Sequence, residues 1–312
     1  AVAFVSFVML RHLGDPINNM LGIEASVEQR EALRAQLGLD RPMIVQFADY
    51  LAGAVRGDFG VSLRLREPVW DVVMERLPAT LELVGVSALF AVVVGVALGI
   101  RTGLARDSLA SRAILTLSLV GVSIPTFLIG IGLIYLFAVV LGVLPSNGRG
   151  ETVDLGWWET GLLTASGWRS ILMPAFTLGI FQLTLILRLV RGELLEVLRT
   201  DHIKFARARG LPDRAVHYRH ALANTLMPVV TIIGLQVGSL IAFALVTETV
   251  FNWPGIGALF VQSVNFADVP VMSAYLTLVA LVFVTMNVLV DILYYVIDPR
   301  LKMSGRRRGR AT

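Results

Sequence analysis

The sequence predicts an all-α integral membrane protein with six transmembrane helices, the first N-terminally truncated, and an external insertion between helices 1 and 2. Of its 312 residues, 55% are hydrophobic and only 16% are charged, whereas soluble domains carry about a quarter charged residues. Several apolar runs are long enough to cross a bilayer core, which takes about 20 residues of helix. Basic residues gather in alternate loops between those runs, as they do in multi-pass proteins.

Five long apolar runs predict transmembrane helices 2 to 6. Four contain no charged residue, and the first contains only Glu82. Pro125 lies inside the second run and predicts a kink, because proline removes a backbone hydrogen bond from a helix. The last helix is expected to continue past Asp291 to Ile297. The runs cover Ala79–Ile100, Ala113–Leu144, Ile171–Leu187, Ala221–Thr247 and Val269–Val290.

The first part of the chain divides into a short apolar segment and a longer polar one. Residues 1–12 are apolar as far as Leu10, which is too short to span a bilayer. We interpret them as a truncated first transmembrane helix; the hydrophobic region of a signal peptide is the competing interpretation. Residues 13–78 are mostly polar and predict the external insertion, in which Glu28–Leu37 has the pattern of an amphipathic helix ended by Gly38.

Charge distribution predicts the orientation. Residues 101–112, residues 188–219 and the tail from Arg300 hold three, eight and six basic residues, whereas the intervening short loops hold only Arg149 and Arg169. The strongly basic loops are expected in the cytoplasm, so both termini lie inside and the polar insertion lies outside. The sequence thus predicts a multi-pass protein of the cytoplasmic (inner) membrane.

The predicted transmembrane core covers residues 79–300 and includes a cytoplasmic loop over residues 191–222. Residues 301–312 form a basic cytoplasmic tail, in which Arg306–Arg308 suits contact with anionic membrane lipid. So short a basic run does not indicate nucleic-acid binding.

No catalytic constellation is visible. The chain has no cysteine and no G-x-x-x-x-G-K-[ST] phosphate-binding loop, so it cannot hydrolyse ATP in the P-loop manner. His217 and His220 have a spacing that could bind a metal, but the arginines around them favour a solvated basic face. We expect no enzyme activity, metal site or cofactor in this chain.

The stretch Thr200–Pro228 is a basic loop between two apolar runs. Small residues precede Gly210, and Pro212 follows it closely. Glycine suits the left-handed position just past a helix end, and proline suits the first turn of the next helix. The pattern predicts two short helices that meet at Gly210 and present a basic surface; an ordinary positive-inside loop is the alternative.

Polar side chains inside the spans are costly and therefore informative. Three amides either line a pathway or join helices by hydrogen bonds, and the sequence leaves both interpretations open. Glu248 and Asp291, near the ends of spans, are candidates for the membrane interface, and Trp253 suits the outer interface. The three amides are Gln182, Gln236 and Asn287.

The basic loop resembles a known family. Ala206–Leu211 reads A-R-A-R-G-L and is followed by Arg219–Leu222 and Asn224. These residues resemble the EAA loop of ABC-importer permeases, in the dipeptide/oligopeptide branch. Lys204–Phe205 and Leu222–Ala223 depart from the general EAA consensus, and both departures are also typical of the peptide branch.

Other segments resemble the B-type permease subunit of that branch, in the same order along the chain, so the resemblance covers nearly the whole sequence. They are Gly14–Pro16, Gly57–Ser62, Arg76–Leu81, Glu248–Gly257 (E-T-V-F-x-W-P-G-x-G), and Asn287, Asp291 and Asp298–Arg300 at the end.

The resemblance implies the translocation subunit of an ATP-driven importer of di- or oligopeptides that works by alternating access. The implied partners are a second homologous permease subunit, two cytosolic ABC ATPases that bind ATP and Mg, and an extracytoplasmic substrate-binding protein. Nucleic acid is not among them. The implied ATPase-coupling residues are Lys204, Phe205, Ala206, Arg207, Ala208, Arg209, Gly210, Leu211, Pro212 and Asp213.

Other functions stay open. Within the importer interpretation, the cargo could be nickel, haem or a sugar. A self-sufficient secondary transporter would need an ion site at the membrane midplane, where the sequence places no charge. A membrane-embedded enzyme would need a catalytic constellation, which is not visible.

Overall fold

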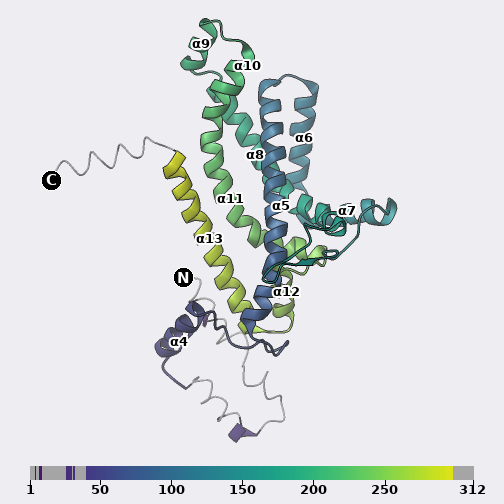
Figure 1. Cartoon of the computed structure of the whole chain (residues 1–312), viewed down its shortest axis with the longest axis vertical. Helices are drawn as coiled ribbons and strands as arrows, with labels where there is room; N and C mark the ends of the chain where they lie inside the picture. Colours follow the sequence, from purple (N-terminus) through teal and green to yellow (C-terminus); the bar gives the residue numbers. More distant parts are fainter. Residues whose placement is uncertain (1–3, 5–6, 9–25, 30, 32–39, 298–312) are drawn as a thin grey trace, which may run out of the picture.

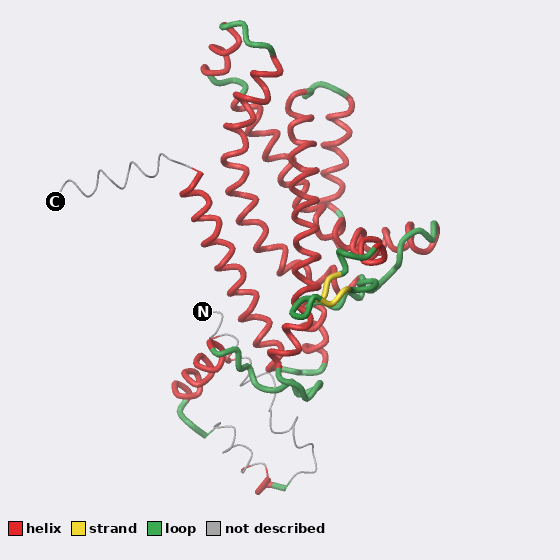
Figure 2. Tube along the Cα trace, in the orientation of Figure 1, coloured by secondary structure: helices red, strands yellow, loops and turns green. Residues whose placement is uncertain are grey.

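The computed structural model describes residues 4, 7–8, 26–29, 31 and 40–297. This part of the chain is mostly helical, with one two-stranded antiparallel hairpin (Figure 2), so the all-α class is confirmed. The helices are α4 (Met43–Val55), α5 (Val69–Leu104), α6 (Leu109–Ser123), α7 (Thr126–Leu133), α8 (Ala165–Val197), α9 (Asp201–Ala208), α10 (Asp213–Ala215), α11 (Leu222–Val250), α12 (Ile256–Asn265) and α13 (Val269–Ile297). The π-helical segments are η1 (Ile134–Val140) and η2 (Val216–Ala221), and the strands are β1 (Val153–Asp154) and β2 (Glu159–Thr160).

Helices α5, α8, α11 and α13 are the long helices of the fold, and they run lengthwise through the molecule (Figure 1). Of these, α5, α8 and α13 are long and apolar enough to cross a membrane, which confirms three predicted spans. Helix α11 covers nearly all of the predicted run Ala221–Thr247. The predicted first helix, the amphipathic helix Glu28–Leu37 and the tail 301–312 lie mostly or wholly outside the described residues, so the count of six stays a prediction.

Pro125 does more than kink the predicted span Ala113–Leu144. Helix α6 ends at Ser123, and the helix formed by α7 and η1 starts at Thr126 in a direction that differs by 106°. Proline cannot continue the α6 hydrogen-bond ladder, and it forces the residue before it out of the helical region. Ile124 is accordingly extended, with φ −90° and ψ 130°. The kink predicted at Pro125 is confirmed, and it is sharp enough to divide the run into two helices.

Helix α5 begins at Val69, before the span predicted from Ala79, and Pro78 lies inside it without ending it. Its 36 residues measure about 54 Å at 1.5 Å per residue, more than the ~30 Å of a hydrocarbon core. The last part of the predicted insertion 13–78 is thus helical and continuous with the core. Its external location stays a prediction.

Helices α5 and α8 form the most extensive helix pair. Gly95, Gly99 and Gly103 of α5 are four residues apart and face α8. A Cβ at Gly99 would lie 2.7 Å from the Val190 Cβ, and one at Gly103 would lie 2.9 Å from Leu194 Cδ2. The missing side chains allow a close approach of the two backbones, as small residues do between membrane helices.

The loops predicted to be cytoplasmic lie at one end of the molecule. The turn between α5 and α6 and the helices α9 and α10 occupy that end (Figure 1), and Arg106, Arg199, Arg207 and His217 line a common cavity of about 470 Å³ there. Helices α4 and α12 lie toward the other end (Figure 1). This arrangement fits the predicted orientation.

Candidate functional site

The Gly210 hairpin (residues 201–221) forms most of the loop predicted over residues 191–222. Helix α9 ends at Ala208, and α10 begins at Asp213. Gly210 between them has a φ of +75°, a left-handed conformation that glycine adopts without a Cβ clash. The short helix before Gly210 and the turn at Gly210 are confirmed, whereas the predicted second short helix is wrong, because α10 continues without a break through η2 into α11.

Two backbone hydrogen bonds close the end of α9. The Gly210 N–H donates to the Arg207 carbonyl (2.9 Å), and the Leu211 N–H donates to the Ala206 carbonyl (3.4 Å). This pairing is the Schellman motif of helix ends, which requires the left-handed residue. Pro212 follows with φ −65° and ψ 146° and starts α10. The direction of the turn is therefore set by the backbone at Gly210.

The inner face of the hairpin is apolar and joins it to α8. Ile203 and Ala206 of α9, Val216 and Ala221 of η2, and Leu194 of α8 form one buried cluster. Since the Leu194 side chain also faces Gly103 of α5, the hairpin packs on the end of the α5–α8 pair. Ala206, predicted as a coupling residue, belongs to this core, so it supports the outer face instead of forming it.

The outer face combines aromatic and basic groups. Phe205 and Tyr218 are 64% and 56% exposed, and the Arg209 guanidinium carbon lies 5.7 Å from the centre of the Phe205 ring. Lys204 forms an exposed ion pair with Asp201 (2.8 Å). Exposed aromatic rings beside arginine are typical of protein interfaces. The exposed members of the predicted coupling set are Lys204, Phe205, Arg207, Ala208, Arg209, Gly210, Leu211, Pro212 and Asp213.

The three predicted pathway residues lie on three different helices. Gln182 of α8 is buried, and its Nε2 has no hydrogen-bond partner among the described residues; the same holds for Oδ1 of Asn287 on α13. Gln236 of α11 is half-buried, and its Oε1 accepts from the Ser239 hydroxyl (3.3 Å). Their role in a pathway stays a prediction.

At the other end of the helices, a buried carboxylate holds the turn after α11. Glu248 is fully buried and accepts hydrogen bonds from Thr80 Oγ1 (2.6 Å) and the Ala258 N–H (2.9 Å). A Cβ at Gly255 or Gly257 would lie 2.3 or 2.9 Å from this carboxylate, which explains both glycines of the E-T-V-F-x-W-P-G-x-G segment. Glu248 is thus enclosed by the protein near the end of α11, and its expected depth at the membrane interface stays a prediction.

Trp253 in the same turn is also buried inside the protein, and its expected place at the outer membrane interface stays a prediction. Its Nε1–H donates to the Ala79 carbonyl of α5 (2.9 Å), and the Ile256 N–H donates to Thr80 Oγ1 (2.9 Å). Glu82, one turn further along α5, forms an ion pair with Arg149 (2.7 Å). Sequence analysis did not predict these contacts, although the single charge in the first apolar run was a signal for them.

The insertion is attached at the same end. The Ser62 hydroxyl and the backbone N–H groups of Leu63 and Arg64 all donate to the carboxylate of Asp268, between α12 and α13. Ser62 ends the G-D-F-G-V-S segment Gly57–Ser62, so this segment has a docking role in the fold. No group of three or more His, Asp or Glu in the described part of the chain could hold a metal ion.

The long apolar helices of the fold are those of a multi-pass membrane protein. Residues 95–303 match the family model of the binding-protein-dependent transport system inner membrane component, and residues 1–84 match the N-terminal model of such membrane components. The chain therefore belongs to the family of inner membrane components of binding-protein-dependent transport systems.

Its relatives are similar over almost their whole length. The chain is 39% identical to the di/tripeptide transport system permease protein DppB of Pseudomonas aeruginosa, over 96% of this chain and 94% of the relative. It is 38% identical to the glutathione transport system permease protein GsiC of Escherichia coli K12, over 96% and 94%. A solved structure of the MetNI methionine ABC transporter matches with a TM-score of 0.58 at 19% identity, over 73% of this chain and 96% of that one; this likeness shows the fold alone.

Proposed function

We propose that this chain is the transmembrane permease subunit of an ATP-driven ABC importer that moves di- or oligopeptides across the cytoplasmic membrane. The observation that carries the proposal is the 39% identity, over 96% of the chain, to a di/tripeptide permease. The glutathione permeases support the same class of cargo, because glutathione is itself a short peptide.

The proposed partners follow from this assignment. Two cytosolic ABC ATPases bind ATP and Mg and supply the energy, and a second homologous permease subunit completes the pore. An extracytoplasmic binding protein delivers the peptide. This chain supplies no catalytic group and acts by conformational change.

The Gly210 hairpin is the proposed contact with an ATPase. Its exposed Phe205, Tyr218 and Arg209 offer a compact surface on a helix pair whose geometry is set by its own core. Movement of an ATPase would pass from the hairpin through Leu194 to the α5–α8 pair, since the Leu194 side chain packs on the hairpin and also faces Gly103 of α5. Gln182, Gln236 and Asn287 are the proposed polar contacts of the pathway.

Uptake measurements in the native host test the cargo. Deletion of the gene for this chain should abolish ATP-dependent uptake of a labelled dipeptide or tripeptide, and a plasmid copy should restore it. Uptake of labelled nickel and haem should stay unchanged. Normal peptide uptake in the deletion strain, with loss of nickel or haem uptake, would contradict the peptide assignment and leave the importer class intact.

A further inference from the structure

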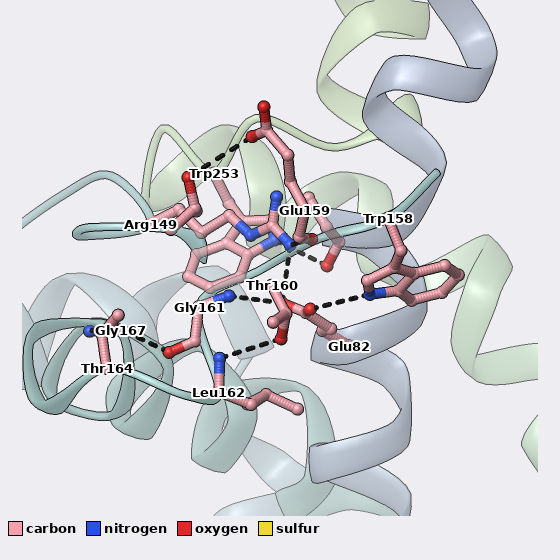
Figure 3. A network of polar contacts seen from close by, with 12 residues as sticks. Glu82, Arg149, Trp158, Glu159, Thr160, Gly161, Leu162, Thr164, Gly167 and Trp253 are labelled. Carbon is pink, nitrogen blue, oxygen red and sulfur yellow. Dashed lines mark hydrogen bonds and ion pairs between the residues drawn. The ribbon is translucent and has the colours of Figure 1, made fainter. Parts of the chain in front are cut away.

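The loop between η1 and α8 is fastened to α5 by a buried ion pair. This segment, the β1–β2 loop (residues 141–164), carries Arg149, whose Nη2 lies 2.7 Å from Oε2 of Glu82 (Figure 3). The two side chains are only 7% and 4% exposed. A buried ion pair contributes little net stability, because desolvation offsets the attraction, but it can specify one conformation.

Glu82 holds several parts of the loop at once. Its Oε1 accepts a hydrogen bond from Trp158 Nε1 (3.1 Å), and its Oε2 accepts one from the Gly161 N–H (3.5 Å). Arg149 Nη2 also donates to the Glu159 carbonyl. One carboxylate therefore binds the segment before β1, the turn between β1 and β2 and the segment after β2 (Figure 3).

The middle of the loop is weakly packed. Residues 150–157 are all exposed, and the Trp157 side chain is 84% exposed. Gly148 and Gly150, on either side of Arg149, have φ values of +79° and +76°. Leu162, near the end of the loop, packs on the apolar core of α5, α8 and α11, and the Glu151 N–H and carbonyl bind Ser166 and Thr164. Release of the segment around Arg149 from Glu82 would therefore expose two charges to water and little apolar surface besides Leu162.

Glu82 is linked to the Gly210 hairpin through the packed helices α5 and α8. Ala79 and Thr80, on the same turn of α5 as Glu82, bind the turn after α11, and the Gly148 N–H donates to the Phe251 carbonyl of that turn (3.0 Å). The other end of α5 packs through α8 on the hairpin. A displacement of α5 at the hairpin end would thus reach Glu82.

We propose that Glu82 is a positioning residue of the transport cycle: its ion pair with Arg149 holds the β1–β2 loop against α5 and opens and re-forms as the α5–α8 pair moves. This rests on the proposed function, since it assigns the ion pair to the cycle of an ATP-driven importer.

The test uses the assembled transporter in proteoliposomes, with its ATPases and binding protein. Thr160 in β2 is 6% exposed, and the chain has no natural cysteine, so Thr160→Cys gives this subunit a single labelling site for a hydrophilic maleimide. Labelling should be slow at rest and about tenfold faster during ATP turnover, in the range of typical site-to-site coupling. Equal rates in both conditions would overturn the proposal.

A neutral double variant separates positioning from stability. Glu82→Gln with Arg149→Met leaves no unpaired buried charge, so the transporter should assemble and hydrolyse ATP normally. Labelling of Thr160→Cys in this background should be fast even at rest, and substrate uptake per ATP should fall by about tenfold. Arg169→Gln, at an exposed position of α8, should behave as wild type.

Wild-type uptake per ATP in the double variant would show that the pair is merely structural. If the wild-type transporter imports no peptide, the proposed cargo fails, but the labelling result still decides the role of Glu82 because it requires only ATP turnover.

Discussion

Glu82, Glu248 and Asp268 are buried carboxylates near the end of the helices opposite the Gly210 hairpin, and each accepts at least one backbone N–H. Their partners are far away in the sequence: Glu82 binds Arg149, and Asp268 binds Ser62. Hydropathy could show that a charge within an apolar run is unusual, but it could not identify a partner. The sequence predicted that Glu248 lies near the end of a span, but it could not predict that Thr80 and the Ala258 N–H would bind its carboxylate.

Removal of the Asp268 carboxylate should release the insertion. Asp268→Ala leaves the Ser62 hydroxyl and two backbone N–H groups without their acceptor, at a cost of about 1–3 kcal/mol. We expect a lower Tm in detergent and faster trypsin cleavage at Arg64 and Arg66. Glu75→Ala, which alters an exposed position of α5, is the matched control. The same Tm and cleavage rate in both variants would contradict the docking role.

At the scale of elements, prolines show what the sequence can predict and what it cannot. Pro78 and Pro174 lie inside the continuous helices α5 and α8, whereas Pro125 separates α6 from α7. All three lie in or next to apolar runs. Whether a helix continues depends on which neighbours satisfy the freed backbone groups, and these neighbours come from tertiary packing. The end of α9 before Gly210 was predictable, because it depends on the left-handed conformation of that one glycine and not on distant neighbours.

The close contact between α5 and α8 predicts different effects for two glycine substitutions on α5. In Gly99→Ala the new Cβ would lie 2.7 Å from the Val190 Cβ and 2.9 Å from the Leu187 carbonyl oxygen, an overpacking worth about 1–3 kcal/mol. Gly85→Ala meets no atom within 4 Å and should preserve stability. We expect a lower Tm for Gly99→Ala than for Gly85→Ala in thermal unfolding of the two purified variants. Equal Tm values would contradict the close approach of α5 and α8.

At the scale of the whole molecule, charge alternation and architecture agree. The sequence assigned the α5–α6 turn and the 191–222 loop to one side of the membrane, and the structure places them at one end. The hairpin was predictable from the sequence, but its division into a buried and an exposed face was not. The contacts of Ala79–Glu82 could not be predicted from the sequence either, because they join three separate segments of the chain.

The orientation can be tested with inserted protease sites. A site at Gly156, in the exposed part of the β1–β2 loop, should be cut by protease added to intact spheroplasts. A site at Asp107, in the α5–α6 turn, should be cut only after lysis. Cleavage in the opposite order would reverse the topology and move the Gly210 hairpin away from the ATPases.

The Gly210 hairpin is proposed to transmit ATPase movement to the helices. Gly210→Val forces a β-branched side chain into a left-handed conformation, at a cost of roughly 1–2 kcal/mol or more, whereas Gly210→Asn keeps a residue type accepted there. No atom lies within 4 Å of a Cβ at Gly210, so neither variant clashes inside the chain. The most direct measurement is ATPase co-purification together with peptide uptake at matched membrane levels. We predict that Gly210→Val loses both and that Gly210→Asn keeps most of each; full ATPase retention and wild-type uptake in Gly210→Val would contradict the account.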